Sequence, residues 1–169
     1  MHRRQPLPRL WLMTDERMGE RLWDGLERLP AGSGVVFRHY SLGPDARRML
    51  WEDIRTIARQ RQFVLIAAGA SLPGADGCHN RRGSGIRTAS AHNLRELKAA
   101  ERRGADLVFL SPVFATRSHP NAIALGGARF AFIARQAQVP VIALGGMDAR
   151  KARLLRGAYG WAAIDAWSA

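Results

Sequence analysis

Small and hydroxylated residues gather directly after two short apolar runs in the second half of the chain. The two runs span residues 106–110 and 139–144. The residues that follow them are Ser111, Thr116, Ser118, Gly145 and Gly146. Hydroxyl groups and bare backbone N–H groups bind anions, and glycine lets the backbone approach a ligand closely. The grouping predicts a phosphate site where the runs end, although a Gly-Gly pair alone is equally typical of a tight turn.

Both apolar runs are predicted as buried strands with a helix between them. Each run is short and rich in β-branched or aromatic residues, which favours a strand. Residues 128–138 have a helix-forming composition, with apolar residues spaced as on one buried face at Phe130, Ile133, Ala134 and Ala137. Strand, helix and strand make a βαβ unit, in which ligands bind beyond the carboxyl ends of the strands.

The same alternation continues along the whole chain. Strands are predicted at residues 10–14, 34–38, 63–67, 77–79, 86–89, 106–110, 139–144 and 160–164. Helices are predicted at residues 17–29, 44–61, 94–103, 128–138 and 149–156, with Asn93 and Asp148 as N-caps of the third and the fifth. Eight strands in this order predict an α/β fold, a (β/α)8 TIM barrel, with a flavodoxin-like open sheet as the alternative.

Some stretches between strands leave no room for a full helix. Residues 68–76 and 80–85 are short and rich in Gly, Ser and Pro, and the chain ends almost directly after the last strand. We therefore expect a compact barrel with some helices shortened or missing. An uncovered barrel wall would be apolar, so a second copy of the chain is expected to cover it, which predicts a homodimer.

Length and composition favour a single domain over residues 1–169, with a basic N-terminal tail at residues 1–9. A chain of 169 residues that is 47% hydrophobic can bury one substantial core. No apolar stretch approaches the roughly 20 residues that span a bilayer, and no signal peptide is apparent, so a cytoplasmic location is expected. The single cysteine, Cys78, excludes an internal disulfide and is expected to be a small buried side chain.

A net charge of +12 favours anionic ligands. The charge comes almost entirely from arginine, because Lys98 and Lys151 are the only lysines. The arginines are scattered, without a basic run or an interleaved aromatic motif, which disfavours specific nucleic-acid binding. The expected partner is a small phosphorylated metabolite.

Several segments together resemble the thiamine phosphate synthase and TenI family. They are LWLMTDE (10–16), GADGCHN (74–80), RTASAHNLRELKAAERRGADLVFLSPVFATRSHP (87–120) and VPVIALGGM (139–147). The resemblance covers nearly the whole chain and implies a (β/α)8 barrel. It also implies a reaction in which an aminopyrimidine-methyl pyrophosphate and a thiazole phosphate are joined to give thiamine phosphate. Pyrophosphate leaves before the thiazole nitrogen attacks, so the chemistry is positioning and electrostatic stabilisation.

The resemblance assigns roles to particular residues. Arg38 matches the pyrophosphate-binding arginine and Ser90 the serine of an SxH element, in which His92 is expected to hold the loop by hydrogen bonding. Residues of the implied thiazole-phosphate site are Thr116, Arg117, Ser118, Gly145 and Gly146, together with Ile164 and Asp165, whose backbone N–H groups complete the site.

Other family positions are changed in ways that remove the implied Mg²⁺ site. Ala67 and Ala68 stand where the family has an Asn-Asp pair, and residues 80–85 contain no carboxylate. Mg²⁺ prefers oxygen ligands, commonly carboxylates, so we expect no metal site and no cofactor. Two family lysines are replaced by Tyr40 and His119.

Two further departures concern the phosphate site and the tautomerase branch. Asp165 replaces a serine and would repel a phosphate unless Arg117 or Arg129 compensates. The histidine that TenI-type thiazole tautomerases use is replaced by Pro112.

Three functions follow as alternatives. The first is a synthase-like transferase in which Arg81 and Arg82 take over from the metal. A second is a non-catalytic barrel that binds thiazole phosphate or thiamine phosphate, as a regulatory subunit for example. The third is an isomerase or lyase for another phosphate ester, with His119 or His79 as the acid or base.

Overall fold

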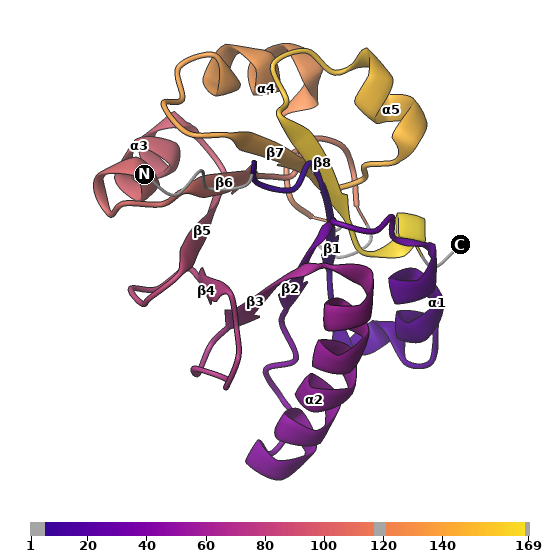
Figure 1. Ribbon diagram of the computed structural model, residues 1–169. Helices are drawn as coiled ribbons and strands as arrows, with labels where there is room; N and C mark the ends of the chain where they lie inside the picture. The colour runs from indigo at the N-terminus through magenta and orange to yellow at the C-terminus, as the bar shows by residue number, and fades with distance from the viewer. Residues whose placement is uncertain (1–5, 117–120, 168–169) are drawn as a thin grey trace.

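Eight parallel strands close into a barrel in chain order, with helices on its outside (Figure 1). The computed structural model describes residues 6–116 and 121–167. The strands are β1 (Leu10–Met13), β2 (Gly34–Phe37), β3 (Val64–Ala68), β4 (Gly77–His79), β5 (Ile86–Ala91), β6 (Leu107–Leu110), β7 (Val141–Leu144) and β8 (Gly160–Ala163). The helices are η1 (Glu16–Met18), α1 (Arg21–Arg28), α2 (Pro44–Arg61), α3 (Leu94–Arg102), α4 (Gly126–Ala134), α5 (Ala149–Leu154) and η2 (Asp165–Trp167). The prediction of a TIM barrel is confirmed.

Alternate residues of each strand fill the barrel interior. The interior cluster includes Trp11, Val36, Ile66, Phe109 and Ile142, and the Trp11 and Phe109 rings meet edge to face with centroids 5.3 Å apart. The intervening residues point outward and pack under the helices in two further clusters. Such two-sided burial explains why the strands are short continuous apolar runs.

The helix boundaries follow local capping signals. The side chains of Asn93 and Asp148 accept hydrogen bonds from backbone N–H groups in the first turns of α3 and α5, as predicted. One predicted helix, residues 17–29, divides into η1 and α1, because Gly19 between them takes a φ of 52°. The predicted helix at residues 128–138 ends earlier, and Gln138 instead donates its N–H to the Glu101 carboxylate.

Other parts of the chain cover the barrel wall at β4 and β8, where full helices are missing. No helix lies in the described loops between β3 and β4 or between β4 and β5, as predicted. The outward-facing Cys78 on β4 is nonetheless 1% exposed, and its Sγ donates a hydrogen bond to the Arg81 carbonyl in the next loop. Beside β8, Trp167 of η2 stacks on Trp161 at 4.6 Å between centroids. The expectation of a second copy rested on exposed walls, and homodimerisation remains a prediction.

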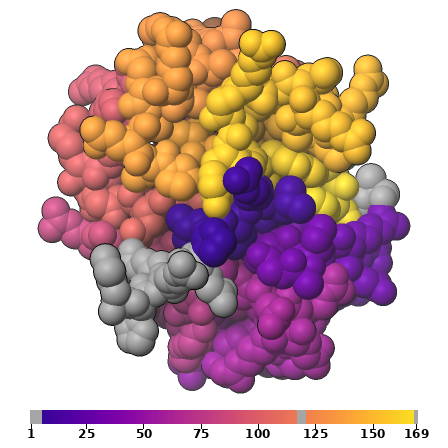
Figure 2. All heavy atoms as spheres, turned by 45° about the horizontal axis from the view of Figure 1, so that its top comes forward, coloured from indigo at the N-terminus to yellow at the C-terminus, as the bar shows by residue number. Residues whose placement is uncertain are grey.

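The described part of the predicted basic tail, residues 6–9, packs on the barrel next to β8 (Figure 2). The Arg9 carbonyl accepts the Trp161 N–H at 2.8 Å, and the Leu7 carbonyl accepts the Tyr159 hydroxyl at 2.8 Å. These bonds tie the start of the chain to its last strand. Among the described residues, no helix combines the length and apolar character needed to cross a membrane.

Candidate functional site

A cavity of about 450 Å³ opens at the carboxyl ends of the strands, mainly over β5 to β8. Seven residues of the predicted substrate and phosphate sites line this cavity: Arg38, Ser90, Thr116, Gly145, Gly146, Ile164 and Asp165. The other three predicted residues, Arg117, Ser118 and His119, lie outside the described residues. Parallel strands explain the convergence, because their carboxyl ends all open on the same face of the barrel.

The loop after β7 lines the cavity with two glycines in left-handed backbone conformations. Gly145 and Gly146 have φ values of 96° and 60°, which side chains rarely permit. A Cβ on Gly146 would lie 2.4 Å from the Ala115 carbonyl oxygen. The Gly145 carbonyl accepts the Phe114 N–H at 3.0 Å. In a trans peptide unit the C=O and N–H groups point in opposite directions, so the Gly146 N–H faces away from Phe114.

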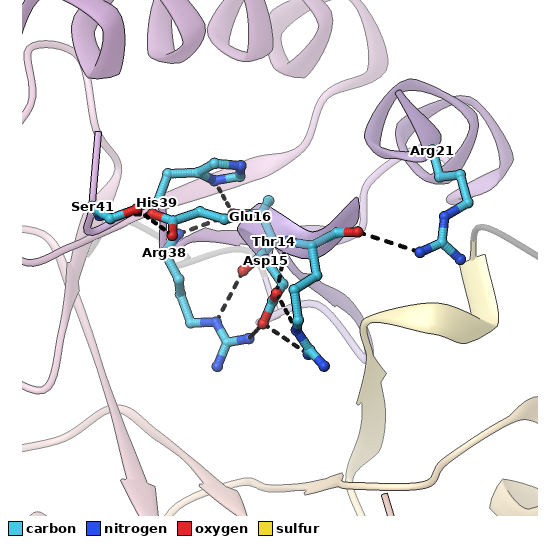
Figure 3. Close-up of polar contacts among 8 residues, drawn as sticks. Thr14, Asp15, Glu16, Arg21, Arg38, His39 and Ser41 are labelled. Carbon is cyan, nitrogen blue, oxygen red and sulfur yellow. Dashed lines mark hydrogen bonds and ion pairs between the residues drawn. The ribbon is translucent and has the colours of Figure 1, made fainter. Parts of the chain in front are cut away.

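Arg38, directly after β2, contributes a guanidinium to the cavity wall (Figure 3). Its Nε donates to the Thr14 carbonyl at 3.1 Å, and one Nη lies 3.4 Å from the Asp15 carboxylate. Asp15 also holds Arg17 through two bonds, of 2.7 and 3.1 Å. The hydrogen bond from Arg17 is the largest influence that lowers the pKa of Asp15. Among the described residues, no hydrogen bond or ion pair engages the other Nη group of Arg38.

Further bonds fix the β1 and β2 loops to each other. The Glu16 carboxylate accepts the backbone N–H of Ser41 at 2.7 Å and its hydroxyl at 2.5 Å (Figure 3). The Thr14 hydroxyl accepts the Arg38 N–H and lies 3.1 Å from His39 Nδ1. Burial lowers the pKa of His39. The loop that carries Arg38 is therefore held in place by its neighbour.

Ser90 belongs to a hydrogen-bonded network that runs into the barrel. His79 lies 2.9 Å from the Thr88 hydroxyl through Nδ1 and 3.1 Å from the Ser90 hydroxyl through Nε2. Burial lowers the pKa of His79 to about 4, so the ring is neutral near pH 7. The Thr88 hydroxyl donates to the Cys78 carbonyl, which makes it the acceptor for His79 Nδ1–H. Ser90 then donates its proton to Nε2.

Asn80 completes the support of Ser90 and was not predicted from the sequence. Its side-chain oxygen accepts the Ser90 N–H at 2.7 Å, and it also lines the cavity. Its position in the sequence could have indicated this role, because Asn80 is a polar residue directly after β4 and the carboxyl ends of the strands form the site. As predicted, His92 helps to hold its loop by a hydrogen bond, because its Nδ1 lies 2.8 Å from the Ser111 carbonyl oxygen.

The strand ends at which the family resemblance implies Mg²⁺ ligands carry no carboxylate: Ala67 and Ala68 end β3, and residues 80–85 follow β4. The described residues also contain no group of three or more His, Cys, Asp or Glu side chains placed to hold a metal ion. The buried Arg47 reaches from α2 to the strand ends, donating to the His39 carbonyl at 2.8 Å and to the Ala68 carbonyl. A guanidinium thus lies at the end of β3, where the metal-binding carboxylate of the resemblance is replaced by Ala68.

The arginines predicted to replace the metal lie elsewhere. Arg81 and Arg82 line a small groove of about 70 Å³ together with Arg87 and Arg103, and neither of them lines the main cavity. Arg81 donates to the Ser71 hydroxyl at 3.1 Å.

Arg117 or Arg129 was predicted to offset the negative charge of Asp165. Arg17 is a further cation that can do so. The pKa of Arg17 is raised, mainly by its hydrogen bond to Asp15, with a further electrostatic contribution from Asp165. Arg17 was not singled out in the sequence, because its proximity to Asp165 depends on how β1 and β8 meet in the closed barrel.

The family model and the similar sequences agree on one family. Residues 10–167 match the family model described as thiamine monophosphate synthase. A protein assigned as thiamine-phosphate synthase 2 in Aquifex aeolicus (strain VF5) is 32% identical, over 94% of this chain and 97% of its own. The thiamine-phosphate synthase of Chloroflexus aurantiacus (strain ATCC 29366 / DSM 635 / J-10-fl) is 31% identical, over 94% of this chain and 84% of its own.

A solved structure supports the fold. Thiamine phosphate pyrophosphorylase from Pyrococcus furiosus superposes with a TM-score of 0.77 at 23% identity, covering 95% of this chain and 88% of that one.

Proposed function

This chain belongs to the thiamine monophosphate synthase family, and we propose that it acts in thiamine biosynthesis as a synthase-like protein that holds a thiazole phosphate. The loop of Gly145 and Gly146 is the observation that carries this proposal. It lines a cavity of about 450 Å³ together with Thr116 and the turn at Ile164. Backbone N–H groups and a hydroxyl in one concave site suit a phosphate ester.

In the proposed reaction, this chain contributes positioning and fixed charge. The phosphate of the thiazole would be anchored by the glycine loop, which orients the ring nitrogen toward the pyrimidine carbon. Arg38 would offer its remaining Nη group to the departing pyrophosphate, while Thr14 and Asp15 hold its other donors in place. One guanidinium is modest support for a leaving group with several charges. We therefore expect slow turnover compared with a relative that binds a metal.

Two measurements test this proposal. Calorimetric titration compares thiazole phosphate with the same thiazole as its unphosphorylated alcohol, and we expect only the phosphate ester to bind appreciably. A synthase assay with both substrates, with and without Mg²⁺, then follows release of pyrophosphate. Binding together with product under either condition supports the proposal. Absence of product under both conditions contradicts the transferase activity.

A non-catalytic barrel that binds thiazole phosphate or thiamine phosphate is the second candidate. Arg47 favours it, because this side chain bonds the carbonyls at the ends of β2 and β3 and Ala68 supplies no carboxylate there. Phosphate-dependent binding without product in the synthase assay would favour this candidate over the transferase. His79 gives little support to the third alternative, an isomerase or lyase. The low pKa of His79 makes this side chain a weak base near neutral pH.

A further inference from the structure

The two lysines of this chain each make the same two kinds of contact. The chain carries 26 basic residues, and only Lys98 and Lys151 are lysines. Each ammonium donates to a backbone carbonyl in another loop and pairs with a nearby carboxylate: Lys98 with Gln136 and Glu101, and Lys151 with Gly146 and Asp148. A compact ammonium on a flexible stem can reach one carbonyl, whereas a guanidinium is a wider planar fork. The chemistry of both positions suits lysine.

Lys151 binds the carbonyl of Gly146 in the glycine loop and does not itself line the cavity. Its Nζ lies 2.6 Å from the Gly146 carbonyl oxygen and 3.3 Å from the Asp148 carboxylate. The ammonium also lies 5.6 Å from the centre of the Phe114 ring. Gly146 and Met147 line the cavity, whereas Lys151 and Phe114 do not. The lysine is therefore held in place by a carboxylate and a ring while it holds the loop.

This contact sets the direction of a second backbone donor. The Gly146 carbonyl shares a peptide unit with the Met147 N–H, so the carbonyl bond to Lys151 turns that N–H the opposite way. The Gly145 carbonyl is held by Phe114 in the same manner. In the described chain, the N–H groups of Gly146 and Met147 donate to no backbone acceptor in a turn or loop. Two neighbouring donors thus remain for a ligand in the cavity.

We propose that Lys151 is a positioning residue for phosphate binding, which fixes the Met147 N–H group toward the anion, beside the Gly146 N–H group that Phe114 orients. The inference rests on the proposed function, because it assumes that the ligand carries its phosphate at this loop. Lys151 acts through the backbone. Glycines at positions 145 and 146 leave the loop free to adopt other conformations, and the lysine selects the binding one.

The test compares Lys151→Met with Lys98→Met. Both variants lose an ammonium that holds a carbonyl and pairs with a carboxylate, but only Lys151 contacts the glycine loop. We expect Lys151→Met to weaken binding of thiazole phosphate roughly tenfold. Lys98→Met is expected to bind it as the unaltered protein does. Inorganic phosphate serves as a second probe and should show the same pattern. Lys151→Arg is expected to restore less than half of the lost binding free energy.

Amide hydrogen exchange without any ligand provides an independent readout. In Lys151→Met we expect the Met147 N–H group to exchange faster, with unchanged exchange in β6 and β7. Equal thiazole phosphate affinity in Lys151→Met and the unaltered protein overturns the role of Lys151, even if both proteins bind tightly. If the unaltered protein binds neither probe, the proposed phosphate site itself is wrong and this inference falls with it.

Discussion

The two sides of the barrel mouth differ in what their strand ends present. The ends of β5 to β8 offer Ser90, Thr116 and the glycine loop to a shared cavity. Of the residues that follow β1 to β4, only Arg38 and Asn80 reach it. At β2 and β3 the strand-end carbonyls are taken by Arg47. One barrel can therefore keep a phosphate site on one side while the other side becomes structural, because each strand end carries its own loop.

The largest expected effect on ligand binding follows from a change in the glycine loop, on the β5 to β8 side. Gly146→Ala would place a Cβ 2.4 Å from the Ala115 carbonyl oxygen, at a φ of 60°. The loop must move, so we expect thiazole phosphate affinity to fall roughly 100-fold by calorimetry. Gly157→Ala is the matched control, because it has a φ of 83° and its added Cβ would meet nothing closer than 3.6 Å. Similar losses in both variants would mean that general strain, and not the glycine loop, is responsible.

The second prediction concerns His79, which connects the two sides from β4. Burial lowers its pKa to about 4 from 6.5, so the folded protein binds fewer protons than the unfolded chain between these values. Stability is therefore expected to fall as the pH drops from about 6.5 toward 4, by about 3 kcal/mol from this residue. Urea unfolding of the unaltered protein and of His79→Gln at pH 7 and pH 4.5 measures the difference. An equal pH dependence in both proteins would contradict the assignment.

The third prediction concerns the side with fewer ligand contacts. Arg38→Met removes a side chain that lines the cavity after β2. Inorganic pyrophosphate is expected to bind roughly tenfold more weakly, because a charge-assisted hydrogen bond is lost. Thiazole phosphate affinity is expected to change by less than about twofold, since its proposed contacts lie on β6 to β8. A larger loss for thiazole phosphate than for pyrophosphate would reverse the division between the two sides.

The smallest expected effect is that of removing metal ions with EDTA on the affinity for thiazole phosphate. The described residues hold no cluster of three metal-ligating side chains, so EDTA is expected to leave thiazole phosphate affinity unchanged within about twofold. Parallel titrations with Mg²⁺ and with EDTA give the comparison. A marked dependence on Mg²⁺ would show that carboxylates such as Asp165 bind the ion together with the ligand.

Much of the barrel could be predicted because its signals are local. Strand runs, the N-caps at Asn93 and Asp148, and the glycines after β7 can each be recognised within a few residues of sequence. Arg47 could not be assigned in this way, because its contacts with β2 and β3 depend on how α2 lies across the strand ends. The covering of β8 by Trp167 likewise depends on the path of the chain after the strand.

The central claim is that the phosphate site lies on the β5 to β8 side of the mouth. A titration of ¹⁵N-labelled protein with thiazole phosphate, followed by amide chemical shifts, tests it most directly. We predict that the largest shifts occur at Gly145, Gly146 and Met147, with small changes at His39 and Ala68. Shifts centred on the ends of β2 and β3, or none at saturating ligand, would contradict the claim.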